Sequence, residues 1–253
     1  MGESFCVFII TNDLINLWQS SAQDLQRLKK WATGYLTNYD EYKINKCYEY
    51  SYDHKWRKQL AQGLRILAKI LHIDEIVNSL PKTCDQLILI PHLYLHLFPL
   101  HALPLTNNTP KYLIDAFPGG VSYAPSCQLL HQVQKYKRDK FDKLFAIQNP
   151  NDDLIPADME VETIEKIFPN SEILAKQNAK KGEKSESKLE IAEKAADSHH
   201  LFFSCHGFFD RNNPLQSGLQ LYDGTLTLEE IIRYFNLSEC SLVTLSACET
   251  GQV

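Results

Sequence analysis

A short apolar run leads into a polar sequence that contains a cysteine in the segment Leu242-Val243-Thr244-Leu245-Ser246-Ala247-Cys248-Glu249-Thr250-Gly251. A short run of mostly apolar and β-branched residues of this kind indicates a strand. A second segment of the same kind lies upstream and reads Leu201-Phe202-Phe203-Ser204-Cys205-His206-Gly207. We therefore predict two strands, each followed by a loop whose side chains include one able to do nucleophilic or acid–base chemistry.

The residues around these segments alternate between strand and helix patterns from about residue 141 onward. Apolar runs predict strands at Leu144–Ile147 and Ile173–Leu174, and helical spacing predicts helices near residues 161–168, 189–196 and 227–235. Asp223-Gly224 is a strong hairpin signal, and a capping box formed by Thr227 and Glu230 begins the last helix. This alternation predicts an α/β fold in which a mostly parallel sheet has helices on both faces.

The two loops that carry His206 and Cys248 are expected to meet in space. In open α/β sheets, sites form just beyond the carboxyl ends of the strands, and adjacent strands bring their loops to the same edge. A thiolate is a strong nucleophile, and a nearby imidazole can remove its proton and later protonate a leaving amine. The backbone N–H groups of Gly207 and Cys248 are then candidate donors to a developing oxyanion.

Judged by spacing alone, His206 and Cys248 could equally well have purely structural roles. Cys248 is then a small buried hydrophobic residue and His206 is a loop residue with satisfied hydrogen bonds. Cys205 is a weaker candidate nucleophile, because a side chain directly before the base usually points elsewhere. Glu249 is interpreted as a solvated loop charge rather than a pocket residue.

The N-terminal part of the chain reads as helical, with apolar residues at helical spacing near residues 25–35 and 56–71. It is followed by a predicted strand at Leu87–Ile90 and a proline-broken segment that contains His92, His96 and His101. A zinc site needs three or four ligands in a tetrahedral array, and no HExxH motif is present. We therefore predict no metal site, and a Cys-His pair needs no organic cofactor.

The composition of the chain limits its partners and its compartment. The 253 residues include 26 Lys and Arg against 31 Asp and Glu, a net charge of −5, which argues against direct nucleic-acid binding. No apolar run is long enough for a spanning helix, and no basic flank precedes a long apolar run near residue 1, so we expect no secretory signal. The seven cysteines are spread along the chain without a CxxC pair, so we expect reduced thiols in the cytoplasm and no membrane partner.

The wording of these motifs resembles the CHAT family, which comprises caspase-like peptidase domains often associated with tetratricopeptide repeats. The two signature blocks are the segments around His206 and Cys248 that are quoted above. Further matching blocks are Leu87–Pro104, Ser122–Ser126 and Leu219–Gly224. The resemblance covers roughly residues 80–253, in order.

The resemblance implies a cysteine endopeptidase of protein or peptide substrates, with Cys248 as nucleophile and His206 as general base and acid. It implies oxyanion donors at the backbone of Gly207 and Cys248. It also implies a caspase-like fold built from a helical region (residues 1–80), part of a non-catalytic, degenerate caspase-like half (residues 81–140) and a catalytic half (residues 141–253). A regulatory repeat or sensor region is a further expected partner.

Asp152 and Asp153 follow the first strand of the expected catalytic half. In caspase-like architecture this loop approaches the P1 side chain of the substrate. A carboxylate there would favour Arg or Lys at P1. Asp152 and Asp153 are therefore candidate substrate-binding residues, with solvated loop acids as the alternative.

The sequence departs from the family pattern after Cys248, because the chain ends at Val253 and further strands are expected beyond the cysteine. We expect one unpaired sheet edge, which a C-terminal chain would complete, and little activity from this chain alone. The alternative function is that of a catalytically incompetent fragment or a non-catalytic interaction module that retains the fold. A cysteine-dependent transferase or amidohydrolase would use the same two residues, but the motif wording does not support it.

Overall fold

The computed structural model describes residues 4–45, 55–106, 111–136 and 138–248. The chain divides into two compact units, Met1–Leu130 and His131–Val253. The expected catalytic half, residues 141–253, lies within the second unit. Each unit has its own sheet and its own core, and each is described separately.

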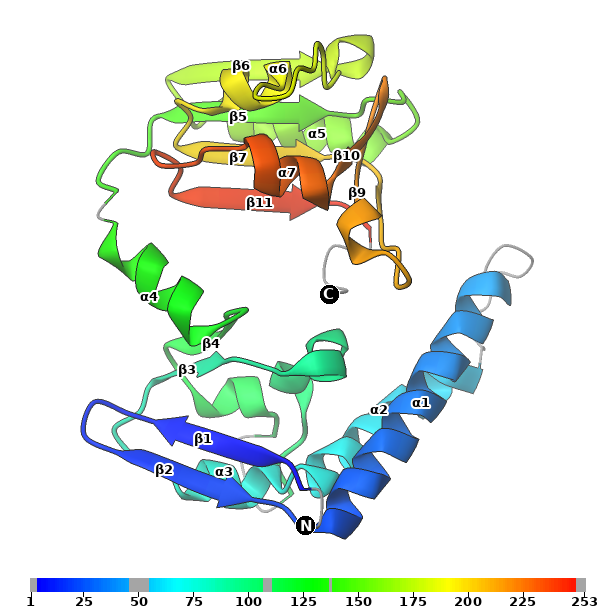
Figure 1. Cartoon of the computed structure of the whole chain (residues 1–253), viewed down its shortest axis with the longest axis vertical. Coiled ribbons are helices and arrows are strands. Elements are labelled where there is room, and N and C mark those ends of the chain that lie inside the picture. Colours follow the sequence, from blue (N-terminus) through cyan, green and yellow to red (C-terminus); the bar gives the residue numbers. More distant parts are fainter. Residues whose placement is uncertain (1–3, 46–54, 107–110, 137, 249–253) are drawn as a thin grey trace. The chain divides into compact units, whose positions relative to one another are not determined.

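The second unit is built on a four-stranded sheet in the order β11-β7-β5-β6 (Figure 1). All neighbouring pairs in this sheet are parallel, as predicted. The strands are β5 (Lys143–Gln148), β6 (Asn170–Ala175), β7 (His200–Ser204) and β11 (Leu242–Ser246). β7 is buried along its whole length because it lies between two neighbours and between two layers of helices.

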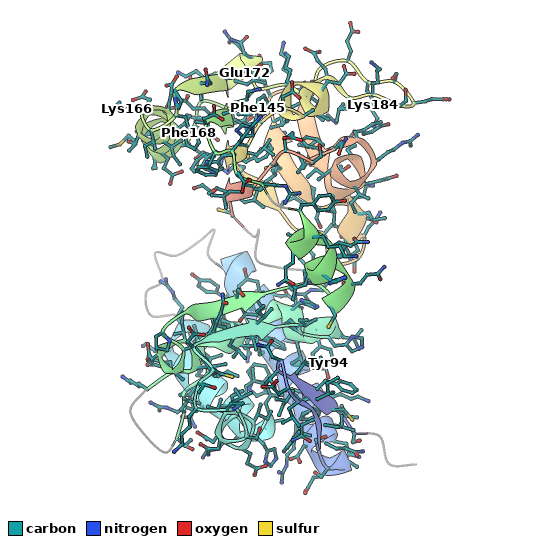
Figure 2. The ribbon with its side chains drawn as sticks, turned by 90° about the vertical axis from the view of Figure 1, so that its left-hand side faces the viewer. Tyr94, Phe145, Lys166, Phe168, Glu172 and Lys184 are labelled. Carbon is teal, nitrogen blue, oxygen red and sulfur yellow. The ribbon has the colours of Figure 1, made fainter. Side chains whose placement is uncertain are left out.

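Helices cover both faces of this sheet (Figure 1). On one face, α5 (Ile155–Glu165) packs Val161 and Ile164 against Leu144, Ala146 and Phe202. On the other face, α6 (Glu190–Ala195) and α7 (Leu228–Tyr234) pack against Phe145, Ile147, Leu201 and Phe203. Figure 2 shows Phe168 and Lys184 on opposite sides of the sheet. Alternate residues of the central strands β5 and β7 therefore face opposite cores, which explains their continuous apolar runs. The edge strand β11 instead leaves Leu242, Val243 and Leu245 exposed.

A small antiparallel sheet follows β7 in the chain. It contains β8 (Gly207–Phe208), β9 (Gly218–Leu221) and β10 (Gly224–Thr227), in the order β10-β9-β8. The Asp223-Gly224 turn joins β9 to β10, and the predicted capping box at Thr227 and Glu230 begins α7. This sheet matters for the site because β8 begins directly after His206.

The charged segment 180–188 is held against the second unit. The carboxylate of Asp223 accepts hydrogen bonds from the backbone N–H groups of Lys181 (2.8 Å) and Gly182 (3.2 Å). The Nζ atom of Lys184 donates to the buried carboxylate of Glu230 over 2.6 Å. Charge and glycine content predict an exposed loop here, and most of the segment is exposed, but it is also anchored at several points.

The first unit joins a helical pair to two small sheets. Its helices are α1 (Ala22–Asn45), α2 (Lys55–Ile70) and α3 (Ile73–Asn78). The strand β3 (Gln86–Leu89) agrees with the strand predicted at Leu87–Ile90, and it pairs in parallel with β4 (Gly120–Tyr123). The segment between them forms short 3-10 turns at Leu93–Leu97, Leu100–Ala102 and Leu113–Ala116, and α4 (Cys127–Lys135) ends the region.

Two features of the first unit differ from the sequence-based expectation. An antiparallel hairpin, β1 (Cys6–Ile10) and β2 (Ile15–Gln19), precedes the helices, although only helices were expected in this region. The helices also share one core with residues 81–130, because Leu28 and Leu67 pack in the same cluster as Leu103 and Leu113. The helical region is therefore part of one unit with the segment that follows it.

Candidate active site

The register of two neighbouring strands brings the two signature loops together. β7 and β11 are parallel, with Ser204 opposite Ser246 at their ends. His206 and Cys248 each lie two residues beyond these paired serines, so the two loops leave the sheet at the same edge and at the same level. Neighbouring strands are about 4.8 Å apart, which sets the scale of the separation between the two loops.

Gly207 provides direct evidence that the two loops are in contact. A Cβ atom placed on Gly207 would lie 2.7 Å from the carbonyl oxygen of Cys248 and 3.3 Å from the Cβ atom of Ala247. Real side chains do not approach a backbone atom so closely. Residue 207 must therefore be glycine for the Cys248 turn to lie where it does, and the same pair of residues supplies the two expected oxyanion donors.

The backbone and the side chain of His206 are each held by one hydrogen bond. The carbonyl oxygen of His206 accepts a hydrogen bond of 2.7 Å from the N–H of Gln220 on β9. The ring atom Nε2 of His206 lies 3.0 Å from Oδ2 of Asp153, in the loop between β5 and α5. The small sheet thus fixes the backbone, and the neighbouring loop fixes the ring.

Asn149 organises the loop that carries Asp153. Its side-chain Oδ1 accepts hydrogen bonds of 3.0 Å from the backbone N–H groups of both Asp153 and Leu154. Its own N–H donates to the carbonyl of Ser204 at the end of β7, over 2.9 Å. Only 1% of the Asn149 surface is exposed, and its Nδ2 donates to Asp158 on α5. Asn149 therefore connects the Asp153 loop to the strand that leads to His206.

Three residues with left-handed backbone geometry surround this edge of the sheet, namely Asn149 (φ 43°), Asp152 (φ 59°) and Lys176 (φ 51°). Non-glycine residues with positive φ are uncommon and tend to cluster at functional sites. The Oδ1 atom of Asp152 forms an ion pair of 2.7 Å with Nζ of Lys176, which follows β6. This hydrogen-bonded pairing raises the pKa of Lys176. Both candidate substrate-binding carboxylates thus already have a partner.

The two candidate nucleophiles, Cys248 and Cys205, differ in their exposure to solvent. Cys248 is exposed, whereas Cys205 is buried in the core beneath the sheet. Burial raises the pKa of the Cys205 thiol to about 12, so this thiol remains protonated near neutral pH. Burial also raises the pKa of Cys240. Of these three thiols, Cys248 alone is exposed.

The remaining predicted positions lie away from this edge or outside the described residues. His101 is in the first unit, where its Nδ1 lies 2.9 Å from the hydroxyl of Tyr123. Within the described residues, no group of three or more His, Cys, Asp or Glu side chains is arranged to hold a metal ion. Glu249 and Gly251 lie outside the described residues. No helix in the described part of the chain is long and apolar enough to cross a membrane.

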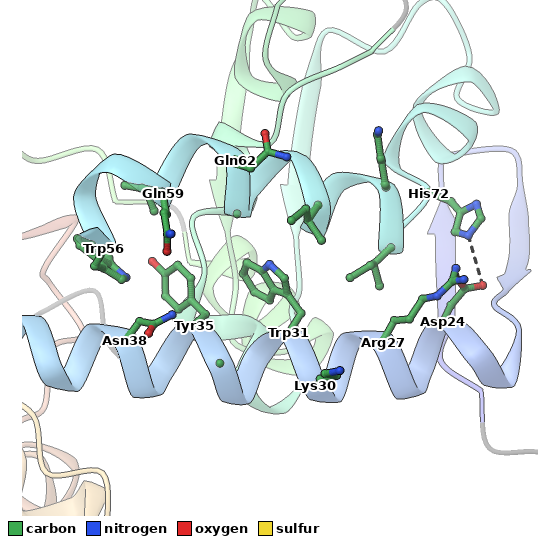
Figure 3. A pocket seen from close by; sticks show the side chains of 16 residues that line it. Asp24, Arg27, Lys30, Trp31, Tyr35, Asn38, Trp56, Gln59, Gln62 and His72 are labelled. Atoms are coloured by element: carbon green, nitrogen blue, oxygen red, sulfur yellow. Dashed lines mark ion pairs between the residues drawn. The ribbon is translucent and has the colours of Figure 1, made fainter. Parts of the chain in front are cut away.

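A cavity of about 810 Å³ lies in the first unit between α1 and α2, and none of the signature residues lines it. Trp31 and Tyr35 from α1 and Trp56 from α2 project toward the space between the two helices (Figure 3). At one end, His72 Nε2 lies 3.3 Å from Oδ2 of Asp24. Among the described residues, no cysteine, serine or threonine lines this cavity.

Comparison with protein families shows to which family the chain belongs. A family model for the CHAT domain matches residues 58–253. The chain belongs to the CHAT domain family. The matched region begins within α2 and includes the whole of the second unit, so the CHAT domain here contains both the parallel sheet and most of the first unit. The mixed α/β architecture, with its parallel sheet flanked by helices, is that of this caspase-like, cysteine peptidase-related family. A search of curated proteins found no match.

Sequence reasoning named the two signature loops of this CHAT domain but gave no role to Asn149. Its position between a predicted strand and Pro150 carried a signal, because Asn tolerates positive φ and caps the loops and helices that follow it. The Asp153–His206 contact had no such signal, because the two residues are far apart in sequence and meet only through the pairing of β5 with β7.

Proposed function

We propose that this CHAT domain is a cysteine endopeptidase that hydrolyses peptide bonds in protein substrates through Cys248 and His206. The observation that carries the proposal is the meeting of their two loops, given by the β7–β11 register and the close approach of Gly207 to the Cys248 carbonyl. Exposure of Cys248 and burial of Cys205 support the choice of nucleophile.

The proposed reaction is acyl transfer in two steps. The Cys248 sulfur, having given its proton to His206, attacks the carbonyl carbon of the scissile bond, and the oxygen takes up negative charge. Backbone N–H groups of Gly207 and Cys248 are the proposed donors to this oxyanion. As the C–N bond breaks, His206 returns the proton to the leaving amine, which leaves a thioester on Cys248.

Hydrolysis of the thioester completes the cycle. His206 removes a proton from a water molecule, the resulting hydroxide attacks the thioester carbonyl, and the carboxylic acid product leaves. His206 gives the proton it took from water to the departing Cys248 sulfur, so both groups return to their starting state and the reaction needs no external cofactor. General acid–base catalysis of this kind contributes roughly 10²–10⁴-fold to the rate.

Partners of the domain are proposed on the same basis. The substrate is a protein or peptide, and Asp152 remains the candidate for contact with a basic P1 side chain through its place beside the site. Within the described residues, β11 pairs only with β7, and Leu242, Val243 and Leu245 on it are exposed. A further chain segment that pairs with this edge, or a regulatory repeat region, is the second proposed partner.

The reactivity of Cys248 tests the function without knowledge of the substrate. Cys6 and Cys127 are exposed like Cys248 but lie in the first unit and in α4, so they serve as references within the same chain. We expect iodoacetamide to alkylate Cys248 at least about tenfold faster than Cys6 and Cys127 at about pH 6, because a thiolate paired with an imidazolium reacts at acidic pH. The His206→Ala substitution should remove this excess.

Cleavage of a mixed peptide library then tests the reaction itself. Because this chain alone is expected to have little activity, we expect only weak cleavage, and we expect that cleavage to disappear in the Cys248→Ala and His206→Ala variants. If Cys248 reacts no faster than Cys6 and Cys127, and no peptide is cleaved, the proposal fails and the chain is a non-catalytic interaction module that retains the fold.

A further inference from the structure

The carboxylate of Asp153 lies in hydrogen-bond contact with the ring of His206, with 3.0 Å between Oδ2 and Nε2. We infer that Asp153 is the positioning residue for His206, so that the catalytic unit is Cys248, His206 and Asp153 rather than a pair. The inference rests on the proposed function and replaces, for Asp153, the expected role in binding a P1 side chain.

The position of Asp153 is set by the same strand that leads to His206. Asn149 accepts hydrogen bonds from the N–H groups of Asp153 and Leu154 and donates its own N–H to the Ser204 carbonyl. Ser204 is two residues before His206. The carboxylate and the imidazole are therefore fixed to one another through a buried asparagine and a short length of backbone, and do not depend on a flexible loop for their contact.

The contact also decides which ring nitrogen can act on the thiol. A carboxylate accepts hydrogen bonds and does not donate them, so Nε2 of His206 carries the proton that faces Asp153. Nδ1 is then unprotonated and is the atom left to take the proton of Cys248. When it does so, the ring becomes a cation beside the Asp153 carboxylate, which stabilises it. Asp153 acts only as the acceptor of this hydrogen bond, and no further proton moves.

This pair has little value as a structural ion pair. The His206 side chain is 41% exposed and the Asp153 side chain 53% exposed, so water screens their attraction. Loss of the contact is therefore expected to leave the fold intact. Its effect should instead be on the fraction of Cys248 present as a thiolate below the pH at which an isolated thiol ionises.

The experiment compares the Asp153→Asn variant with the unmodified chain in alkylation by iodoacetamide from about pH 5 to pH 9, read out separately for each cysteine by mass spectrometry. We expect the variant to lose about tenfold or more of the Cys248 rate at about pH 6 and to approach the unmodified rate at about pH 9, where the thiol ionises unaided. The Asp153→Glu variant should recover part of the acidic rate, because it restores the carboxylate.

Glu162→Gln is the matched control, since it removes one carboxylate from an exposed position on α5 without touching His206. Its profile should match that of the unmodified chain. If Asp153→Asn keeps the Cys248 alkylation rate at acidic pH while His206→Ala loses it, Asp153 does not position His206, and Cys248 and His206 act as a pair. If His206→Ala also keeps the acidic rate, the proposed function fails, and the role of Asp153 fails with it.

Peptide cleavage separates positioning from substrate recognition. A positioning residue lowers kcat equally for peptides with Arg, Lys or Leu before the scissile bond. A P1-binding residue raises KM for the Arg and Lys peptides alone. If Asp153→Asn affects only the Arg and Lys peptides and leaves the alkylation profile unchanged, Asp153 is a P1-binding residue and not a positioning residue.

Discussion

The carbonyl oxygen of Cys248 lies 2.7 Å from the point at which a side chain on Gly207 would begin. The Gly207→Ala substitution therefore forces the Cys248 turn to move, because the methyl group meets backbone and not a flexible side chain. We expect the second unit to lose about 1–3 kcal/mol of stability and the Cys248 alkylation rate to fall. Urea denaturation and site-resolved alkylation measure the two effects.

A glycine in the first unit provides the control for that substitution. Gly34 lies inside α1, and a Cβ atom there meets nothing within 4 Å. Gly34→Ala should raise stability by about 0.5–1 kcal/mol, because alanine loses less backbone entropy in a helix. Equal effects of the two substitutions would show that crowding at Gly207 is not what matters.

Asn149 is the second position at which structure and reactivity should change together. Asn149→Ala removes three side-chain hydrogen bonds at a buried site. It also places alanine at φ 43°, a left-handed backbone conformation that asparagine tolerates better than alanine does. We expect a loss of about 2 kcal/mol or more and a slower Cys248 reaction at acidic pH. Stability lost without any change in that reaction would mean that Asn149 does not position Asp153.

His200 makes the second unit sensitive to acid. It is buried among aromatic rings near Phe141 and Phe202, its Nε2 contacts the Thr244 hydroxyl, and burial lowers its pKa from the ordinary 6.5. The unfolded chain therefore binds a proton on His200 at a higher pH than the folded chain does. Stability should be fully present above about pH 6.5 and should fall as the pH drops toward the lower pKa of the folded state, by at most about 1.4 kcal/mol per pH unit.

The His200→Gln variant tests this source of acid sensitivity, because the amide can still reach Thr244 but does not titrate. Urea denaturation at about pH 7.5 and pH 5.5 should give a smaller loss for the variant than for the unmodified chain. Equal losses would assign the acid sensitivity to other groups.

Glu230 should control access of proteases to the segment 180–188. Burial alone would raise the pKa of Glu230, but hydrogen bonds, first from Lys184 and then from the Thr227 backbone, outweigh burial and lower it. The carboxylate is therefore charged and holds Lys184. Glu230→Gln keeps a side chain able to form the capping box but loses the charge. We expect trypsin to cut the segment several-fold faster in the variant, with cleavage after exposed Lys140 as the internal reference. Unchanged cleavage would mean that other contacts anchor the segment.

Local pattern was enough to predict the framework of the second unit. Apolar runs, the Asp223-Gly224 turn and the Thr227 cap lie within a few residues of the elements they specify, and the observed strands and helices agree with them. The N-terminal hairpin was missed because Val7-Phe8-Ile9-Ile10 does not alternate between apolar and polar residues, and its Asn12-Asp13 turn lacks glycine.

Only part of the arrangement of the candidate site could be predicted from the sequence. Parallel strands place His206 and Cys248 on one edge by topology, which the order of elements suffices to predict. The partner of each loop carboxylate depends instead on left-handed geometry at Asn149 and Asp152, which turns neighbouring acids in different directions. One carboxylate meets His206 and the other meets Lys176, and no spacing rule distinguishes these two outcomes.

The unequal burial of the thiols has a practical consequence for anyone who handles the purified protein. Oxidants in aerated buffer reach exposed sulfur first, so Cys248 is open to sulfenic and sulfinic acids while Cys205 and Cys240 stay protected inside the core. A stored sample can thus keep its circular dichroism spectrum and its melting temperature after Cys248, the candidate nucleophile, has been oxidised. Free-thiol titration at the moment of assay, in buffer with fresh reductant, is therefore the appropriate quality check, ahead of any measure of folding.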